Sequence, residues 1–412
     1  MFVLKAHRYR LDPSTAQAAT FRQWAGCSRW TYNAALSMRE STYTATGKGA
    51  GLAALCRLLT GWRAEHDWLR ACPSQIGQQS IHDMLDAYNR FFKGQNARPT
   101  LKRKGRCRES FRFPNQKSGK TMLLRVERLS RKKARIKLPK VGWVKLRLSR
   151  PIDGEIRSVT VSRDGKHWFA SVLLRTDEEA PPAPTVEEVR EERRLGLDLG
   201  VVQTVTTSDG EVFSVPTMGK GDERHMRRLQ RRLSRRQGPR RGVSPSRRWL
   251  KAKAALQRFH AQLRWRRLDT IHKLTATLTN GEQTDAIVME DLNVKGMTTQ
   301  KRGKGRRAKA KLNAAILSQA WGEIRRQLVY KSERAGIAFR VVDPAYTSQM
   351  CSKCGHTERM NRTTQADFEC RACGHTDNAD HNAAKNISAA GQAAAARPQA
   401  GTRGRKTTEA SG

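Results

Sequence analysis

The sequence predicts a multidomain α/β protein, and three observations lead to this fold class. The amino-terminal half changes near residue 110 from a helix-rich stretch to alternating, strand-rich segments. The segment 177–194, TDEEAPPAPTVEEVREER, is rich in proline and acidic residues, which is typical of a linker between domains. After it, strands and helices alternate, and two pairs of cysteines interrupt them near the end of the chain.

The first domain begins with a strand, because residues 2–11, FVLKAHRYRL, alternate between apolar and polar. Asp12-Pro13-Ser14-Thr15 then predicts a turn and a helix cap. Residues 15–95 are predicted to be helical, with the last helix ending at Gly94, because Trp and Leu recur there with little proline.

Strands return after residue 110, and Asp164-Gly165 lies between two alternating segments, which is a strong hairpin signal. We therefore expect residues 1–11 and 108–176 to form one small β-barrel into which the helices are inserted.

The second half predicts a different order of elements. LGLDLGV, QTVTTS and EVFSV predict three antiparallel strands, followed by basic helices over 221–278. TDAIVMED is a fourth strand, a basic loop spans 295–312, and a helix spans 313–335. IAFRVVDP is a fifth strand, and a last helix starts at about Asp380. This order is that of a ribonuclease-H-like fold. The low-complexity residues from 389 onward are expected to be disordered.

The charge of the chain points to a nucleic-acid partner. The formal net charge is +43, from 80 Lys and Arg against 37 Asp and Glu, and such an excess repels itself unless a polyanion neutralises it. No apolar run approaches the ~20 residues of a membrane-spanning helix, and the amino terminus lacks the apolar region of a signal peptide. We expect a cytoplasmic protein of the prokaryotic cytosol, associated with the nucleoid and not with membranes.

Two segments near the end of the chain are near copies of each other: Cys351-Ser-Lys-Cys354-Gly-His-Thr and Cys370-Arg-Ala-Cys373-Gly-His-Thr. Their spacing, Cys-x2-Cys, fifteen residues, Cys-x2-Cys, predicts a four-thiolate zinc ribbon. The glycine after each second cysteine fits a turn that needs an unusual φ. Four thiolates fill a tetrahedral site, so one structural Zn²⁺ is expected, without His356 or His375 as ligands. The remaining cysteines read as ordinary thiols: Cys27, Cys56, Cys72 and Cys107.

Two acidic residues end apolar, strand-like runs. Asp198 lies in Leu195–Gly200, and Glu290 follows Ala286–Met289. An acid in an apolar strand is costly to bury unless a metal ion or a partner takes its charge. Successive strand residues face opposite sides, so only one of Glu290 and its neighbour Asp291 easily joins a shared site, and the pattern favours Glu290. Taken alone, Asp198 could equally be an exposed strand-end aspartate.

The last helix supplies a third acid, because Asp380, Ala383, Ala384 and Ile387 fall on one helical face. The two alanines allow this face to approach a sheet closely and to carry Asp380 to it. Asp377 is the better candidate for an ordinary acid at a helix N-terminus. Three acids from two strands and a helix can hold two Mg²⁺ ions, which lie ~3.5–4 Å apart in such sites. The pattern therefore predicts a metal-dependent nuclease.

Two segments, 223–241 and 301–311, are strongly basic, and either could be a solvated surface. The first contains MRRLQRRLSRRQGPRRG, which carries too many like charges to lie without a polyanion. We expect the first of them to contact nucleic-acid phosphates, through a group of four arginines: Arg227, Arg228, Arg231 and Arg232.

These residues, in this order, resemble the TnpB family of transposon-encoded RNA-guided nucleases, also described as OrfB-type transposases and related to the type V CRISPR effectors. The resemblance covers nearly the whole chain, from the opening KAHRYRLDP to the motif Tyr346-Thr-Ser-Gln349-x-Cys351-x-x-Cys354-Gly. It implies a wedge-type β-barrel with an inserted helical recognition domain, then a RuvC-like nuclease domain with an inserted zinc ribbon. The implied domains are 1–14 and 101–178 (barrel), 15–100 (recognition), 179–194 (linker), 195–345 and 375–390 (nuclease), 346–374 (ribbon) and 391–412 (disordered tail).

The resemblance also implies roles for individual residues. Asp198, Glu290 and Asp380 match the family's three catalytic acids, which would hold two Mg²⁺ ions, and the four cysteines match its ligands for one Zn²⁺. The implied partners are a guide RNA from the transposon end and a target double-stranded DNA, both of whose strands are cut at one site. We expect a monomer with one RNA. A short DNA motif beside the target would be read by three residues of the recognition domain: Ser74, Gln75 and Gln78.

Two alternative functions remain open at this stage. A transposase that cuts and joins transposon ends would use the same fold and the same acids, although the family resemblance argues against it. An RNA-guided DNA-binding regulator would cut nothing, although the three intact acids argue against that.

Overall fold

The computed structural model describes residues 3–118, 121–177, 181–240, 242–280, 283–300 and 305–393. It separates into two compact units, Met1–Glu179 and Ala180–Gly412. The division falls within the proline-rich segment that the sequence marks as a linker. Part of this segment packs into the second unit, where Val186 and Val189 are buried.

The first unit is built on a seven-stranded antiparallel sheet. Its strands follow the order β2-β8-β9-β1-β7-β6-β5, which does not close on itself in the described residues, so the predicted barrel is a partly open one. β8 and β9 form the hairpin expected at Asp164-Gly165, where Gly165 has a φ of 59°. The strands are β1 (Val3–Asp12), β2 (Ser110–Pro114), β5 (Arg125–Arg128), β6 (Lys133–Leu138), β7 (Gly142–Arg147), β8 (Glu155–Asp164) and β9 (His167–Thr176), with a short hairpin of β3 (Lys117–Ser118) and β4 (Thr121–Met122).

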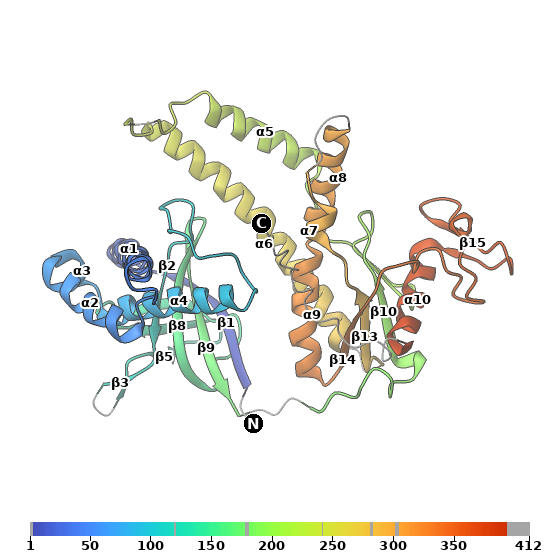
Figure 1. Cartoon of the computed structure of the whole chain (residues 1–412), viewed down its shortest axis with the longest axis horizontal. Helices are drawn as coiled ribbons and strands as arrows, with labels where there is room; N and C mark the ends of the chain where they lie inside the picture. The colour runs from blue at the N-terminus through green and yellow to red at the C-terminus, as the bar shows by residue number, and fades with distance from the viewer. Residues whose placement is uncertain are drawn as a thin grey trace, which may run out of the picture. The chain divides into compact units, whose positions relative to one another are not determined.

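Four helices are inserted between β1 and β2, as the sequence predicts: α1 (Thr15–Thr46), α2 (Leu52–Glu65), α3 (Asp67–Ala71) and α4 (Ser74–Phe92). Ser14 caps α1 with a capping box, accepting a hydrogen bond from the Gln17 backbone N–H at 3.2 Å. Helices and sheet share one core, in which Trp24 of α1 packs edge-on against Phe111 of β2 and Phe21 contacts the same ring at a tilted angle. Figure 1 shows the helices gathered beside this sheet.

The second unit has a five-stranded mixed sheet in the order β12-β11-β10-β13-β14. β10, β13 and β14 are parallel to one another, whereas β11 and β12 run antiparallel. This is the ribonuclease-H-like arrangement expected from the order of elements. The strands are β10 (Arg194–Asp198), β11 (Val205–Thr207), β12 (Val212–Phe213), β13 (Ala286–Glu290) and β14 (Ala338–Val342).

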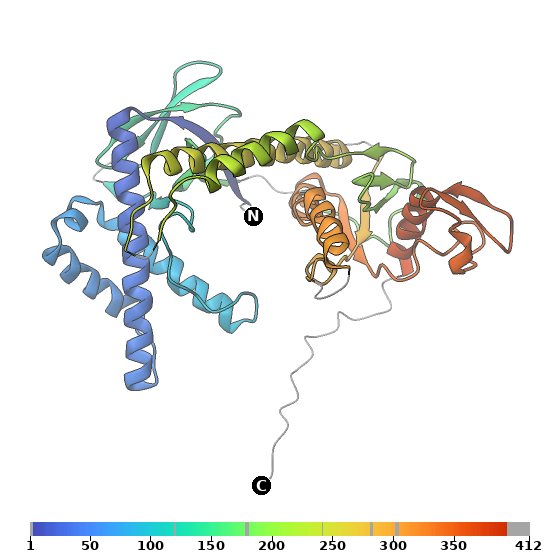
Figure 2. The same ribbon diagram turned by 90° about the horizontal axis from the view of Figure 1, so that it is seen from above.

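Helices cover both faces of this sheet. One face packs against the second half of α6 (Arg247–Asn280) and against α9 (Trp321–Ala335), and the other packs against α10 (Ala379–Ala393). Figure 1 shows the sheet lying between α9 and α10. The first half of α6 pairs instead with α5 (Lys220–Ser234), as Figure 2 shows, through the contact of His225 with Phe259.

The helices between β13 and β14 differ from the prediction of a loop at 295–312 followed by one helix at 313–335. A short α7 (Val294–Met297) is followed by α8 (Arg306–Gln319), so helix begins inside the predicted loop. Ala320, with a φ of 57°, then separates α8 from α9. The break follows from hydrogen bonds of the buried residue next to it, Gln319. Its side-chain amide donates to the Val201 carbonyl at 2.6 Å and accepts from the Thr204 hydroxyl at 2.7 Å.

The sequence predicts disorder from residue 389 onward, and the implied domain layout starts the disordered tail at residue 391. The described residues contradict this for its first part, because α10 continues to Ala393. A Cβ atom on Gly391 would come within 2.5 Å of the Val288 side chain, so the helix packs directly on β13 there. The rest of the predicted tail lies outside the described residues. None of the helices in the described part is both long and apolar enough to cross a lipid bilayer.

Candidate active site

The alternation of β10 and β13 places two acids on the same face of the sheet. Leu197 and Met289 are paired across the two parallel strands and point into the core formed with α6 and α9. Asp198 and Glu290, each the next residue along its strand, therefore face the opposite side, which α10 covers. Because parallel strands end at the same edge of a sheet, the two carboxyl groups lie at one edge.

A close helix–sheet contact brings the third acid to that edge. A Cβ atom on Gly196 would lie 2.0 Å from the Ala384 carbonyl oxygen, so only glycine lets α10 lie this close to β10. Ala383 and Ala384 are buried in the same contact. Asp380 stands in the first turn of α10, and its Oδ2 lies 3.9 Å from where a Cβ atom of Gly200 would be. The structure thus brings together the three acids that the sequence singled out.

The three acids influence one another electrostatically. Burial, followed by the nearby carboxylates of Glu290 and Asp380, raises the pKa of Asp198 to about 7. Burial also raises the pKa of Glu290, although a hydrogen bond from Thr347 opposes that shift. Negative charge is therefore concentrated at this edge beyond what the protein itself neutralises, which is the condition that a bound cation relieves.

Two residues of the ribbon segment reach these acids, and the sequence analysis did not anticipate either. The Thr347 hydroxyl donates a 2.6 Å hydrogen bond to Glu290 Oε1, and both side chains are buried. The Arg362 guanidinium donates to Asp380 Oδ1 at 3.1 Å and opposes the raised pKa of Asp198. A lone Thr or Arg in a loop carries no pattern that would have predicted these contacts.

Two buried asparagines of α10 fasten the start of the ribbon segment to the helix. Asn382 donates to the Met350 carbonyl at 2.8 Å and accepts from the Ser352 N–H at 3.0 Å. Asn386, one helical turn later, donates to the carbonyls of Thr347 and Met350 at 2.9 and 2.6 Å. The signal that could have found them is their i, i+4 spacing beside the small and apolar residues of the buried face of α10.

The two neighbouring acids that the sequence analysis set aside have other partners. Asp291 lies on the α9 side and forms an ion pair with Arg325. Asp377 accepts hydrogen bonds from His381 Nδ1 and Lys385 Nζ, both at 2.9 Å. Nε2 of the same His381 ring lies 3.0 Å from the Ser208 carbonyl oxygen, which connects the start of α10 to the turn after β11. Asp377 therefore stabilises this helix start and does not point to the other acids.

The four cysteines form a second cluster, built by two matching turns. The Cys351 N–H donates to the His356 carbonyl at 2.9 Å, and the Cys370 N–H donates to the His375 carbonyl at 2.8 Å. Gly355 and Gly374 have φ values of 74° and 67°, as expected for the turn after each second cysteine. A small hairpin of β15 (Asp367–Glu369) and β16 (Thr376–Asn378) supports the cluster, which completes a zinc-ribbon fold.

The thiols fit a single zinc ion. Sγ of Cys351 lies 3.8 Å from Sγ of Cys373, and Sγ of Cys354 lies 3.5 Å from Sγ of Cys370. Tetrahedral Zn–S bonds of ~2.3 Å require sulfur atoms roughly 3.8 Å apart. In the described part of the chain, this is the one group of three or more His, Cys, Asp or Glu side chains whose ligand atoms all lie within 4.8 Å of one another. The oxygen atoms of the three carboxylates are therefore spread more widely than the four sulfur atoms.

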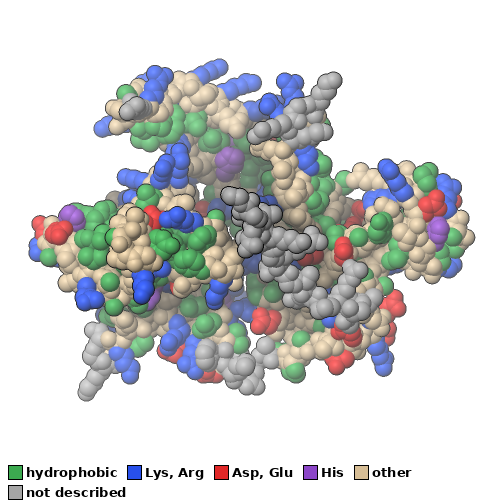
Figure 3. Space-filling model, viewed as in Figure 1, with side chains coloured by type: hydrophobic (Ala, Val, Ile, Leu, Met, Phe, Trp, Pro, Cys, Tyr) green, Lys and Arg blue, Asp and Glu red, His purple; other side chains and the backbone are tan. Residues whose placement is uncertain are grey.

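The predicted nucleic-acid contacts lie on exposed helical surfaces. All four arginines predicted to contact phosphates are exposed on α5, whose buried Leu229 faces α6. Figure 3 shows Lys and Arg side chains spread over the α5–α6 pair. In the first unit, Ser74 and Gln78 are exposed on the first turns of α4, and Gln75 donates to the Gln116 side chain at 2.9 Å.

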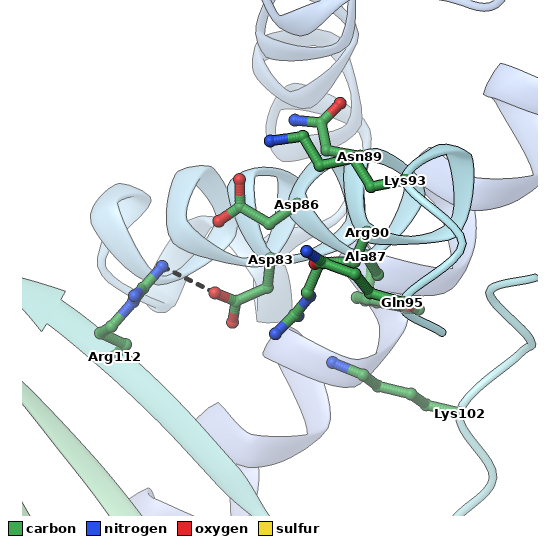
Figure 4. Close-up of a pocket in the computed structure, with 10 residues that line it drawn as sticks. Asp83, Asp86, Ala87, Asn89, Arg90, Lys93, Gln95, Lys102 and Arg112 are labelled. Atoms are coloured by element: carbon green, nitrogen blue, oxygen red, sulfur yellow. Dashed lines mark hydrogen bonds and ion pairs between the residues drawn. The ribbon is translucent and has the colours of Figure 1, made fainter. Parts of the chain in front are cut away.

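A polar cavity of about 740 Å³ lies further along α4 and belongs wholly to the first unit. Figure 4 shows the ion pair of Arg112 with Asp83 at its wall, at 2.6 Å, and Lys102 entering from the loop after α4. The cavity contains acids, cations and amides without an arrangement that suggests a reaction, so it does not compete with the carboxylate site as a candidate active site.

Comparison with protein families matches three parts of the chain. Residues 1–48 match a family described as a helix-turn-helix domain, residues 171–301 match "Probable transposase", and residues 321–387 match "Cas12f1-like, TNB domain". The first description does not suit the structure, because residues 15–46 form the single continuous helix α1. The third match spans both the four cysteines and Asp380.

Whole-chain relatives support the same grouping. The protein called "Putative RNA-guided DNA endonuclease InsQ" of Escherichia coli K12 is 36% identical over 95% of this chain and 93% of its own. A "Putative RNA-guided DNA endonuclease" of Streptomyces pristinaespiralis is 30% identical over 96% and 91%. Among solved structures, Cas12f1 in a complex with sgRNA and target DNA shares the fold, with a TM-score of 0.53, 16% identity and coverage of 91% and 83%.

Proposed function

The chain belongs to the TnpB (OrfB-type) family, and on that premise we propose that it is an RNA-guided DNA endonuclease. One observation carries the proposal: Asp198, Glu290 and Asp380, far apart in the sequence, come together at one sheet edge with a raised pKa at Asp198. We propose that a guide RNA selects the target by base pairing and that this single site cuts both strands of the double-stranded DNA.

We propose that the three carboxylates hold two Mg²⁺ ions. Bound there, such ions activate water and stabilise the leaving oxygen of a phosphodiester. The chain's own contribution is to place the oxygen ligands before substrate arrives. Thr347 fixes the rotamer of Glu290, Arg362 fixes Asp380, and Gly196 sets the approach of α10. The four cysteines hold one Zn²⁺ that stabilises the ribbon carrying Thr347 and Arg362.

We propose that the exposed arginines of α5 bind nucleic-acid phosphates without reading sequence. Each phosphate contact contributes roughly 0.7 to 0.9 to the log–log dependence of affinity on salt. Replacing Arg227, Arg228, Arg231 and Arg232 by Gln should therefore weaken RNA and DNA binding and flatten that slope. Unchanged affinity and slope would leave these arginines as a solvated surface.

We propose that Ser74, Gln75 and Gln78 read the DNA motif that flanks the target, since Ser and Gln side chains bond base edges. The measurement is cleavage of a library with a randomised flank by the triple alanine variant. An altered motif preference supports the assignment, and an unchanged preference removes it.

The experiment that tests the function begins with sequencing the RNA that co-purifies with the full chain. The protein–RNA complex is then given Mg²⁺ and double-stranded DNA matched to the RNA, with DNA of scrambled target sequence as control. Cutting of the matched DNA alone supports the proposal. Cutting and joining of transposon ends without RNA would favour the transposase, whereas matched binding without cutting would favour the regulator.

A further inference from the structure

Tyr346, at the start of the ribbon segment, combines two unusual properties. Its φ is 65°, a left-handed conformation that is strained for a bulky side chain. Its side chain is also largely in solvent, since the residue is 67% exposed. In the described residues the other non-glycine positions with positive φ are Lys140 and Ala320, and neither is aromatic. Burial of the ring therefore does not offset the backbone strain at Tyr346, so its role lies outside the protein core.

The backbone around Tyr346 is held rigidly in spite of that exposure. Its carbonyl accepts hydrogen bonds from the N–H groups of Gln349 and Met350 at 2.9 and 3.0 Å. The next residue, Thr347, is buried, and its carbonyl accepts from Asn386 of α10. An exposed aromatic ring on a fixed backbone is preorganised for contact with a ligand, because little backbone entropy is lost on binding.

The position of this ring relative to the acids suggests which ligand it contacts. Thr347 Oγ1 lies 2.6 Å from Glu290 Oε1. Since consecutive Cα atoms are ~3.8 Å apart, the Cα atom of Tyr346 is within roughly 9 Å of that carboxylate. When a phosphate of the DNA strand lies at the carboxylates, the neighbouring nucleotide of that strand is therefore within reach of the Tyr346 side chain.

On the basis of the proposed function, we propose that Tyr346 stacks on a nucleobase of the unpaired DNA strand that enters the carboxylate site. An RNA-guided nuclease must cut whatever sequence the guide selects, so residues beside its cutting site cannot depend on base edges. Aromatic stacking meets this requirement, because every base has a π-face and stacking tolerates any sequence. Tyr346 thereby holds the strand while the adjacent phosphate lies at the acids.

The first experiment compares Tyr346→Asn with Tyr346→Phe in the protein–RNA complex. Asparagine tolerates positive φ, so it removes the ring without adding strain, whereas phenylalanine keeps the ring. We expect Tyr346→Asn to keep the thermal midpoint of the wild type and to raise KM for matched DNA roughly tenfold, within the range for loss of one stacking contact. Tyr346→Phe should cut as the wild type does. A lower thermal midpoint for Tyr346→Asn, with KM unchanged, would instead indicate a structural role.

A double-mutant cycle locates the contact. Matched DNA is prepared with one abasic nucleotide at a time in the displaced strand. At one position near the cut, the abasic nucleotide should slow wild-type cleavage but add nothing to the defect of Tyr346→Asn. If the abasic nucleotide and Tyr346→Asn reduce the cleavage rate by independent, multiplying factors at every position, the proposal is overturned.

A binding measurement separates this proposal from the proposed function. Tyr346→Trp is placed in the Asp380→Ala background, and single-stranded oligothymidine is added without cleavage. Oligothymidine should quench the tryptophan fluorescence of the double variant more than that of Asp380→Ala alone, because the added indole stacks on a base. If the wild type cuts no matched DNA, the proposed function fails while this quenching still decides the stacking. Absence of additional quenching overturns the role of Tyr346 even if the wild type cuts normally.

Discussion

The second unit contains two clusters of potential metal ligands that are assembled in opposite ways. The four cysteines lie within one short segment, and two similar turns bring their sulfur atoms together. The three carboxylates come from β10, β13 and α10, and meet only when the sheet is complete and α10 packs on it.

The consequence of this difference is that the two clusters depend on different parts of the structure. Geometry at the cysteines is local, so it survives changes elsewhere as long as the turns form. Geometry at the carboxylates is a property of the whole unit, so changes far from any acid can disturb it. Variants that disturb one cluster and spare the other separate these two dependences.

The largest effect is expected from removing a carboxylate. Asp380→Ala and Glu290→Gln should each abolish Mg²⁺-dependent cutting of both DNA strands and leave DNA binding intact, because basic surfaces elsewhere supply most of the affinity. Asp291→Asn is the matched control, since Asp291 pairs with Arg325 on the other side of the sheet. Gel assays of cutting and binding provide both readouts. Near-normal cutting by Asp380→Ala would exclude Asp380 from the site.

The next effect tests whether the carboxylate site depends on packing at a distance. In Gly196→Ala, the new methyl group would clash with the Ala384 carbonyl and force α10 away from β10. We expect destabilisation of about 1–3 kcal/mol or more and a large loss of cutting, although no acid is changed. Gly219→Ala is the control, because a Cβ atom there meets no neighbour within 4 Å. Denaturant unfolding measures the stability, and wild-type behaviour of Gly196→Ala would contradict the close contact.

Breaking the cysteine cluster should have a more local effect on structure. Cys370→Ser should lower the bound zinc, measured by elemental analysis, and make residues near the ribbon more susceptible to proteolysis. Cys107→Ser, outside the cluster, should keep full zinc content. If wild-type protein purified from cells grown with excess zinc contains no zinc, the four thiols have another role.

The last prediction concerns stability alone and should have the smallest effect on cutting, since it is a dependence of the free energy of unfolding on pH in the absence of Mg²⁺. The pKa of Asp198 rises from 3.8 to about 7 on folding. A raised carboxyl pKa contributes stability below about pH 4 that is lost as pH rises through 7, with an upper limit of about 4 kcal/mol at 1.36 kcal/mol per unit. Thermal midpoints measured without Mg²⁺ and without a zinc chelator, from pH 5 to 8, should fall more steeply for the wild type than for Asp198→Asn. Equal slopes would argue against a raised pKa of Asp198 from burial and the neighbouring carboxylates, and added Mg²⁺ should reduce the difference.

The contrast between the clusters also explains what the sequence could predict. The spacing of the cysteines is a local pattern, and the ribbon follows from it. The alternation of apolar and polar residues in the strands is also local, and it indicates the order of the elements and that Glu290, not Asp291, faces the shared site. The contacts of Thr347 with Glu290 and of Arg362 with Asp380 depend on where a folded loop lies, which no local pattern records. The break at Ala320 was missed for the same reason, because its cause is a tertiary contact of Gln319.

The position of the ribbon segment in the chain makes the carboxylate site depend on it. The ribbon segment lies between β14 and α10, and α10 carries the last acid. The same segment supplies a hydrogen bond to Glu290 and another to Asp380. The carboxylate site is therefore complete only when the four-thiol module is folded, so we expect zinc supply and thiol reduction to control how much of the protein becomes competent to cut. Oxidation of the thiols would silence cutting without touching any acid.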